Sequence, residues 1–258
     1  MIKLLFMGRK KYGADALEWC INNGWDVVGV VTDNHQSTSP TANIARKYNL
    51  KLLDYTSLEK EISSNLIEFD LVVSYVYWKI LKKTLIQSPK LGILNFHPAP
   101  LPELRGVGGF NLAILENHET FGVTAHYMDE GIDTGPVVEV DRFPINAKLE
   151  TAQSLEKISH EKMVSLFKKT LKRVQDEGIL PSKKMSGGRH LSRKEMEELK
   201  IIQPGDDVDA KIRAFWFPPY DGASIEIEGK NYTLVNREIL DKVDGDPEAL
   251  FRHTQKGS

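Results

Sequence analysis

Short apolar segments alternate with amphipathic segments through the first half of the chain. The apolar segments carry few polar residues, which is typical of strands buried on both faces of a sheet. We expect strands at residues 2–7, 26–32, 50–53, 69–75 and 92–96. The intervening segments have apolar positions at helical spacing, and we expect helices at residues 12–22, 41–48 and 58–65. This alternation predicts an α/β fold, a Rossmann-like, mostly parallel twisted sheet with helices on both faces.

The pattern changes in the second half. Two β-rich runs at residues 121–128 and 136–143 are joined by a glycine-rich turn and predict an antiparallel addition to the sheet. A long amphipathic helix is expected at residues 151–177, because Gly178 ends its helical pattern. Ser57 is expected to cap the helix at residues 58–65.

The remaining segment predicts a smaller C-terminal part. The elements expected there are a short helix from Ser192 and a small β-hairpin of residues 225–227 and 232–235. We therefore predict two domains, a large α/β domain at residues 1–180 and, at residues 181–258, a linker, the short helix and the small β-containing region.

Composition narrows the class of protein. The chain has 258 residues, with 34 Lys plus Arg against 36 Asp plus Glu, so its net charge of −2 provides no global field for nucleic acid or an anionic membrane. The single cysteine, Cys20, cannot build a disulfide framework or a thiolate zinc site. No apolar run approaches the ~20 residues that span a bilayer. We therefore expect a cytoplasmic enzyme that binds neither nucleic acid nor membrane.

The first strand-to-helix turn lacks a dinucleotide fingerprint. A GxGxxG site needs three glycines, whereas this turn has only Gly8 and Gly13 at the wrong spacing. A plain turn is the simpler interpretation, although Arg9 could reach a phosphate.

Chemistry-bearing residues are densest at residues 95–106, directly after a predicted buried strand. Three prolines there indicate a stiff loop at the carboxyl end of the strand, which is the edge of an open α/β sheet where ligands bind. Asn95 and His97 are two residues apart, so both side chains leave the same face of an extended backbone. A structural role and a chemical role both remain open for this pair.

A second acidic segment follows at residues 129–135. Its carboxylate spacing is not that of an EF-hand calcium loop, which leaves a plain hairpin turn or a carboxylate, Asp133, held beside His97. The other histidines at positions 118, 126, 160 and 190 have no common spacing that suggests a metal, so we expect no metal site.

These motifs together resemble a known family. Asn-Phe-His-Pro-Ala-Pro-Leu-Pro-Glu-Leu-Arg-Gly (residues 95–106), followed by Gly-Ile-Asp-Thr-Gly (residues 131–135), is similar to formyltransferases that use 10-formyltetrahydrofolate. The resemblance extends over roughly residues 1–177 and makes residues 1–180 the expected catalytic domain. Many members have a serine at the position of Ala99 and a leucine at that of Pro100, which leaves the fine shape of this loop open.

The resemblance implies a catalytic trio without a metal. Asn95 would donate to the oxyanion formed when an amine attacks the formyl carbon, His97 would add a donor or shuttle the proton, and Asp133 would orient His97 and help deprotonate the amine. The residues implied in folate binding are Val76, Trp78, Ile80, Leu81, Asp129, Glu130, Gly131 and Ile132. Those implied in substrate binding are Arg9, Lys79, Pro98, Arg105 and Gly106.

The charge of the C-terminal tail, residues 178–258, indicates which amine accepts the formyl group. Residues 178–258 contain 13 Lys plus Arg against 14 Asp plus Glu, which argues against tRNA because phosphate contacts supply most of such affinity. Residues 211–223 resemble the start of the C-terminal region in methionyl-tRNA and sugar formyltransferases. The acceptor expected is a nucleotide-linked amino sugar. The alternatives are a methionyl-tRNA or glycinamide ribonucleotide formyltransferase, a formyltetrahydrofolate hydrolase, and a non-catalytic folate- or nucleotide-binding module.

Four aromatic residues lie between positions 215 and 220, next to the predicted terminal hairpin. An isolated hairpin is marginal in water and must dock on another surface. Because aromatic residues are enriched at interfaces, we expect a homodimer formed through this region. The alternative is that the hairpin packs on its own first domain.

Overall fold

The computed structural model describes residues 1–33 and 37–243, which form two compact units. The strands are β1 (Lys3–Gly8), β2 (Asp26–Val31), β3 (Leu52–Leu53), β4 (Leu71–Tyr75), β5 (Ile93–His97), β6 (Leu104–Gly106), β7 (Thr120–Tyr127), β8 (Val137–Pro144), β9 (Arg189–Leu191), β10 (Ser224–Ile227) and β11 (Lys230–Thr233). The helices are α1 (Lys10–Asn22), α2 (Pro40–Lys47), α3 (Tyr55–Ser63), α4 (Lys83–Ile86), α5 (Gly109–Leu115), α6 (Ala152–Glu177), α7 (Arg193–Leu199), α8 (Val208–Phe215) and α9 (Arg237–Val243).

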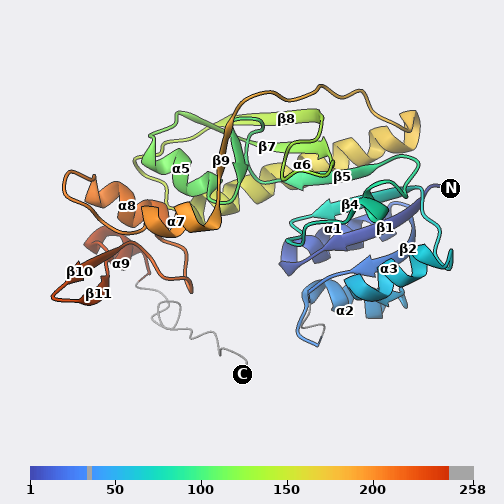
Figure 1. Cartoon of the computed structure of the whole chain (residues 1–258), viewed down its shortest axis with the longest axis horizontal. Coiled ribbons are helices and arrows are strands. Elements are labelled where there is room, and N and C mark those ends of the chain that lie inside the picture. Colours follow the sequence, from blue (N-terminus) through green and yellow to red (C-terminus); the bar gives the residue numbers. More distant parts are fainter. Residues whose placement is uncertain (34–36, 244–258) are drawn as a thin grey trace. The chain divides into compact units, whose positions relative to one another are not determined.

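The main sheet has seven strands in the order β3-β2-β1-β4-β5-β7-β8. Figure 1 labels β1, β2, β4, β5, β7 and β8 of this sheet. The first five of these strands pair in parallel, and β5 pairs with β7 in antiparallel fashion. The prediction of a mostly parallel Rossmann-like sheet with an antiparallel addition is confirmed. The strand order reverses between β1 and β4, and the carboxyl ends of strands at such a switch point form the usual ligand crevice of an α/β sheet.

Helices cover both faces of this sheet, as predicted. On one face, alternate strand residues such as Val72 and Ile93 join a core with Leu58 of α3 and Leu85 of α4. On the other face, three residues further along the same strands, Tyr75 and Phe96 contact the ring of Phe167 in α6. The period-two alternation of strand side chains therefore supplies two apolar layers from one set of strands.

One local prediction is wrong. Ser57 does not cap the third helix, because α3 begins earlier and Asp54 is its cap. The Asp54 carboxylate accepts hydrogen bonds from the backbone N–H of Ser57 at 2.8 Å and from the Ser57 hydroxyl at 2.8 Å. Both residues are suitable caps, and the carboxylate takes the position because it can accept two bonds at once.

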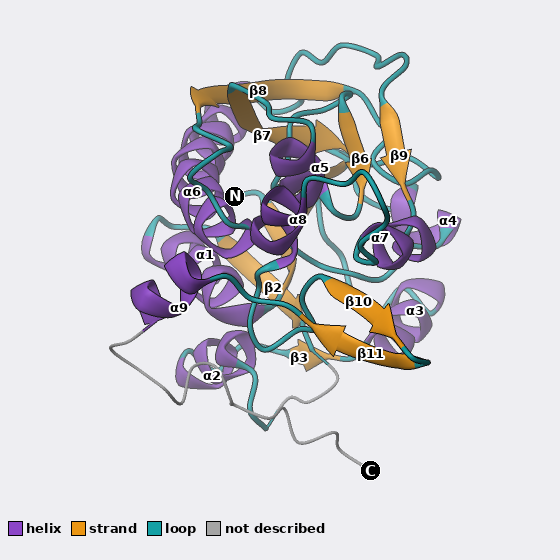
Figure 2. Ribbon diagram, turned by 90° about the vertical axis from the view of Figure 1, so that its left-hand side faces the viewer, coloured by secondary structure: helices purple, strands orange, loops and turns teal. Residues whose placement is uncertain are grey.

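The C-terminal part of the described chain belongs to the second unit (residues 106–121, 142–159 and 189 onward). Its β10–β11 hairpin is antiparallel, with Ser224 opposite Thr233, which confirms the predicted hairpin (Figure 2). Within the same unit, the amide of Asn111 in α5 donates to the carbonyl of Ala214 at 2.7 Å, and Phe215 is buried. Helix α8 therefore packs on α5, and Phe215, the first of the four aromatic residues at positions 215–220, is buried.

Two further expectations concern the whole chain. None of the helices within residues 1–33 and 37–243 is long and apolar enough to cross a membrane. The expected domain division at residue 180 stays a prediction.

Candidate active site

Asn95 and His97 lie on β5, where the strand pairs with β7. In this register Asn95 is opposite His126, and His97 is opposite Thr124. The His97 side chain is buried, and its Nε2 lies 3.1 Å from the carbonyl oxygen of Leu104. A carbonyl oxygen can only accept a hydrogen bond, so Nε2 carries a hydrogen. Nδ1 is left to accept or release a proton. That Nδ1 lies 3.6 Å from Oδ1 of Asp133.

The proline-rich loop after β5 is fixed to β7 by one hydroxyl. Oγ1 of the fully buried Thr124 accepts from the backbone N–H of Leu101 at 3.0 Å and donates to the carbonyl of Ala99 at 2.8 Å. The Ala99 side chain is also buried, so the loop uses its backbone at this position. The loop that the prolines are predicted to stiffen is therefore also held by hydrogen bonds to β7.

Asp133 is presented by a tight loop. Oδ1 of Asp129 accepts from the backbone N–H of Gly131 at 3.0 Å and from the hydroxyl of Thr134 at 2.6 Å. Asp133 itself has a left-handed φ of 51°, a conformation that aspartate tolerates better than most residues. Gly135 allows the loop to approach β7, because a Cβ there would lie 2.9 Å from the carbonyl carbon of Tyr127. The Asp133 carboxylate is 13% exposed, beside His97.

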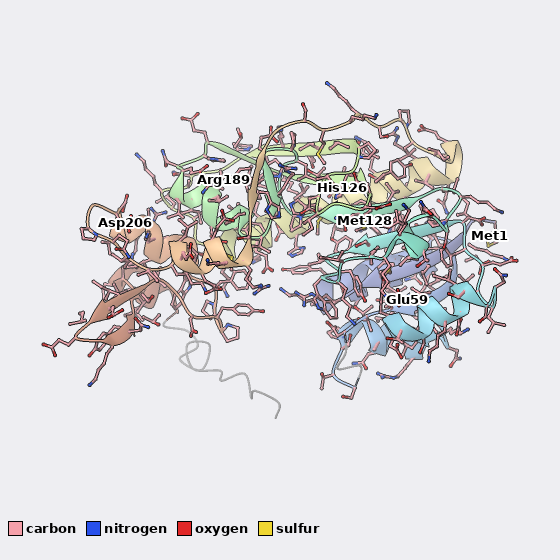
Figure 3. The ribbon with its side chains drawn as sticks, in the orientation of Figure 1. Met1, Glu59, His126, Met128, Arg189 and Asp206 are labelled. Atoms are coloured by element: carbon pink, nitrogen blue, oxygen red, sulfur yellow. The ribbon has the colours of Figure 1, made fainter. Side chains whose placement is uncertain are left out.

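A residue missed by sequence reasoning completes this cluster. His126 is almost fully buried on β7 (Figure 3). Its Nδ1 lies 2.9 Å from the carbonyl oxygen of Tyr127, and its Nε2 lies 2.9 Å from Nδ2 of Asn95 and 3.7 Å from Oδ1 of Asp133. Burial, with the nearby His97, lowers the pKa of His126 to about 4. The sequence placed His126 on a strand predicted to join the sheet. Only the register of β5 and β7 shows that it faces Asn95.

The expected folate-binding residues form two segments, one after β4 and one after β7. Val76 follows β4 with a left-handed φ of 56°, which is strained for a β-branched residue. Trp78 and Ile80 are 43% and 71% exposed, whereas Leu81 is buried. In the second segment, residues 129–132, the carboxylate of Glu130 pairs with a lysine of α4 and Ile132 is 46% exposed.

Two of the expected substrate-binding cations gather on one aromatic ring. The guanidinium of Arg9 lies 5.3 Å from the ring centre of Trp78, and the Lys79 ammonium lies 5.5 Å from the same ring. Residues after β1 and β4 thus meet at the switch point, as parallel topology predicts. The roles of these side chains stay predictions.

The other expected substrate-binding residues are engaged in local structure. The Arg105 guanidinium donates to the carbonyl of Gly188 at 3.2 Å. Gly106 has a φ of 81°, and a Cβ there would lie 2.5 Å from the carbonyl oxygen of Leu191. Pro98 is half-buried in the loop after β5. For these three residues the structure describes packing, and ligand contact stays a prediction.

Asn95, His97 and Asp133 therefore come together around one buried cluster, and their catalytic roles stay a prediction. Among the residues that the structure describes, no group of three or more His, Cys, Asp or Glu side chains could hold a metal ion. The cluster offers a fixed amide, an imidazole and a carboxylate, which suit proton transfer and oxyanion stabilisation.

Known proteins resemble this chain along most of its length. The methionyl-tRNA formyltransferase of Geobacillus sp. (strain WCH70) is 30% identical over 232 residues, covering 83% of this chain and 71% of that protein. An N-formyltransferase from Helicobacter canadensis, solved with folinic acid and dTDP-3-aminofucose, is 24% identical with a TM-score of 0.72, covering 89% of this chain and 85% of its own. A 4-N formyltransferase from Francisella tularensis is 20% identical with a TM-score of 0.75, covering 91% of this chain and 97% of its own.

The family model described as Formyl transferase matches residues 2–171. This match includes the whole seven-stranded sheet and the buried cluster on β5, β7 and the Asp133 loop. The chain therefore belongs to the formyl transferase family, whose members are enzymes that transfer one-carbon formyl groups.

Proposed function

We propose that this enzyme moves a formyl group from 10-formyltetrahydrofolate to the amine of a nucleotide-linked amino sugar. The observation that carries the chemistry is the convergence of Asn95, His97 and Asp133, with the Asp133 oxygen 3.6 Å from Nδ1 of His97. Folate is the one-carbon donor of this proposal, consistent with folinic acid in the Helicobacter canadensis complex.

The mechanism assigns one task to each polar group. The amine nitrogen attacks the formyl carbon, a C–N bond forms, and the carbonyl oxygen becomes an oxyanion that an N–H of Asn95 stabilises. Such a donor typically contributes about 3–4 kcal/mol to the transition state. The proton of the attacking amine then leaves, and the bond between the formyl carbon and N10 of the folate breaks as N10 gains a proton.

The hydrogen bonds of His97 decide which of its atoms handles that proton. Nε2–H is bound to the Leu104 carbonyl, so only Nδ1 can accept a proton. Asp133 Oδ1 lies on that side of the ring, where its negative charge stabilises the imidazolium. The 3.6 Å separation is longer than a hydrogen bond, and we expect it to shorten when substrates are bound.

Two observations support a nucleotide-linked amino sugar as the acceptor: the charge of residues 178–258, and the length over which the chain matches a known N-formyltransferase. Residues 178–258 carry 13 Lys plus Arg against 14 Asp plus Glu, so this segment has no net positive charge to favour tRNA. The chain also covers 85% of the Helicobacter canadensis N-formyltransferase, which was solved with dTDP-3-aminofucose. The second candidate is methionyl-tRNA, which the 30% identity with the Geobacillus enzyme favours.

One experiment separates these acceptors. The enzyme is incubated with 10-formyltetrahydrofolate and, in separate reactions, nucleotide-linked amino sugars, methionyl-tRNA, glycinamide ribonucleotide or no acceptor. Mass spectrometry should find a formyl group on an amino sugar alone, and Asn95→Ala should abolish most of the signal. Formylated methionyl-tRNA or glycinamide ribonucleotide would overturn the sugar assignment. Folate turnover without an acceptor would indicate a hydrolase.

We further propose that the enzyme is a homodimer formed through the C-terminal hairpin. Tyr220, Ile227 and Tyr232 are 63%, 51% and 47% exposed, respectively, on or beside that hairpin. Sedimentation should give about twice the chain mass of 29.2 kDa. Ile227→Glu should shift it toward a monomer, whereas Ile179→Glu, at a 63% exposed position in the other unit, should not. A monomer at all concentrations would contradict the proposal.

A further inference from the structure

The hydrogen on His126 is fixed by its own backbone neighbour. Nδ1 lies 2.9 Å from the carbonyl oxygen of Tyr127, and that oxygen can only accept. Nδ1 therefore carries the hydrogen, and Nε2 of the neutral ring presents a lone pair. The lowered pKa of His126, caused mainly by burial, keeps the ring neutral near pH 7.

That lone pair determines how the Asn95 amide is turned. Nε2 of His126 lies 2.9 Å from Nδ2 of Asn95, so the amide nitrogen donates to it. If the amide were rotated by half a turn, its oxygen would face the ring lone pair, and two acceptors would meet in a buried site. One N–H of Asn95 is thus used by His126, and the other is available in a defined direction.

We propose that His126 is a positioning residue that holds the Asn95 amide with its second N–H directed at the formyl oxygen. This inference rests on the proposed function, because it assigns Asn95 as the oxyanion donor. His126 does not contact the reacting atoms in this scheme. It acts through the cross-strand hydrogen bond that the β5–β7 register creates. The competing explanation is that His126 is a buried histidine that contributes only to stability.

The first test measures the hydrogen bond without any turnover. In ¹⁵N spectra of the histidine- and asparagine-labelled enzyme, His126 should carry hydrogen on Nδ1, and a coupling should cross from Nδ2 of Asn95 to Nε2. The coupling should vanish in Asn95→Ala. Hydrogen on Nε2, or no coupling in the folded enzyme, would overturn the proposal. This readout stands even if the acceptor sugar is wrongly assigned.

The second test is a double-mutant cycle with the acceptor identified above. His126→Leu should lower kcat by about 10- to 100-fold with little change in KM, which is less than the ~10²–10³-fold loss expected when the donor itself is removed. In the Asn95→Ala background, His126→Leu should cause no further loss, since the amide that it orients is gone. Equal losses in both backgrounds would mean a stability role and would refute positioning.

Two variants make the cycle robust. His126→Gln offers a carbonyl oxygen to the Asn95 amide and should recover part of kcat, and it replaces His126→Leu if that variant does not fold. His160→Leu is the matched control, because His160 is also almost fully buried, and its ring stacks on that of Tyr12 with 3.7 Å between the ring centroids. His160→Leu should leave kcat unchanged. A loss of kcat in His160→Leu equal to that in His126→Leu would assign the effect to buried histidines in general.

Discussion

Replacing Gly135 by alanine should separate the geometry of the Asp133 loop from the stability of the enzyme. The added Cβ would lie 2.9 Å from the carbonyl carbon of Tyr127 and 3.1 Å from the backbone nitrogen of Asp129, and closer still to the Tyr127 oxygen. All three atoms belong to the backbone and cannot rotate away. Reaching an ordinary contact of 3.4 Å requires a shift of 3.4 − 2.9 = 0.5 Å for the carbon alone, and more for the oxygen.

The expected losses of stability and of kcat depend on which groups the shift displaces. Gly135 is two residues from Asp133, and the Tyr127 carbonyl holds His126. Overpacking of this kind costs roughly 1–3 kcal/mol of unfolding free energy. A displacement near 1 Å at a catalytic group costs about 10²-fold in rate. We therefore expect Gly135→Ala to lose about 2 kcal/mol of stability and about 10²-fold of kcat.

Gly178→Ala is the matched control. Gly178 has a φ of 74°, and a Cβ added there would meet no described heavy atom within 4 Å. Alanine at this position therefore incurs only the left-handed backbone cost of about 1–2 kcal/mol. Urea unfolding measures both free energies, and steady-state kinetics with the identified acceptor measures kcat. Both variants should be destabilised, and only Gly135→Ala should lose activity. A folded Gly135→Ala enzyme with the kcat of Gly178→Ala would refute the idea that this close approach positions Asp133.

Three further predictions concern the buried cluster and the segment that follows β4. His97→Ala and Asp133→Asn should each lower kcat by about 10²–10⁴-fold while circular dichroism stays native, and near-normal turnover would remove that residue from the chemistry. Val76→Gly should raise the urea midpoint of unfolding slightly. The reason is that relief of about 1–2 kcal/mol of left-handed strain exceeds the ~0.5–1 kcal/mol entropic cost of glycine. A lower midpoint would contradict this. The pKa of His126 is lowered to about 4 from its ordinary 6.5, so the unfolded chain binds more protons between these values. Unfolding free energy should therefore fall as pH drops from 6.5 to 4, and the slope should be smaller in His126→Gln.

The class of fold and two of the key positions can be predicted from local sequence pattern alone. Apolar runs separated by amphipathic segments predict a parallel sheet because a strand buried on both faces needs no polar side. The two-residue spacing of Asn95 and His97 places them on one face of any extended strand. The three prolines after them fix a loop at the strand end. Each of these conclusions depends only on neighbours within a few residues.

The other contacts of the site depend on how distant strands pair. His126 is 31 residues from Asn95, and it faces that amide only because β7 pairs with β5 in one particular register. A shift of one residue would turn every side chain of β7 to the opposite face. Likewise, the local pattern does not show that Phe215 is buried, because that depends on how α8 packs within its unit. Local pattern determines which elements form, but the register between distant strands determines which polar groups meet.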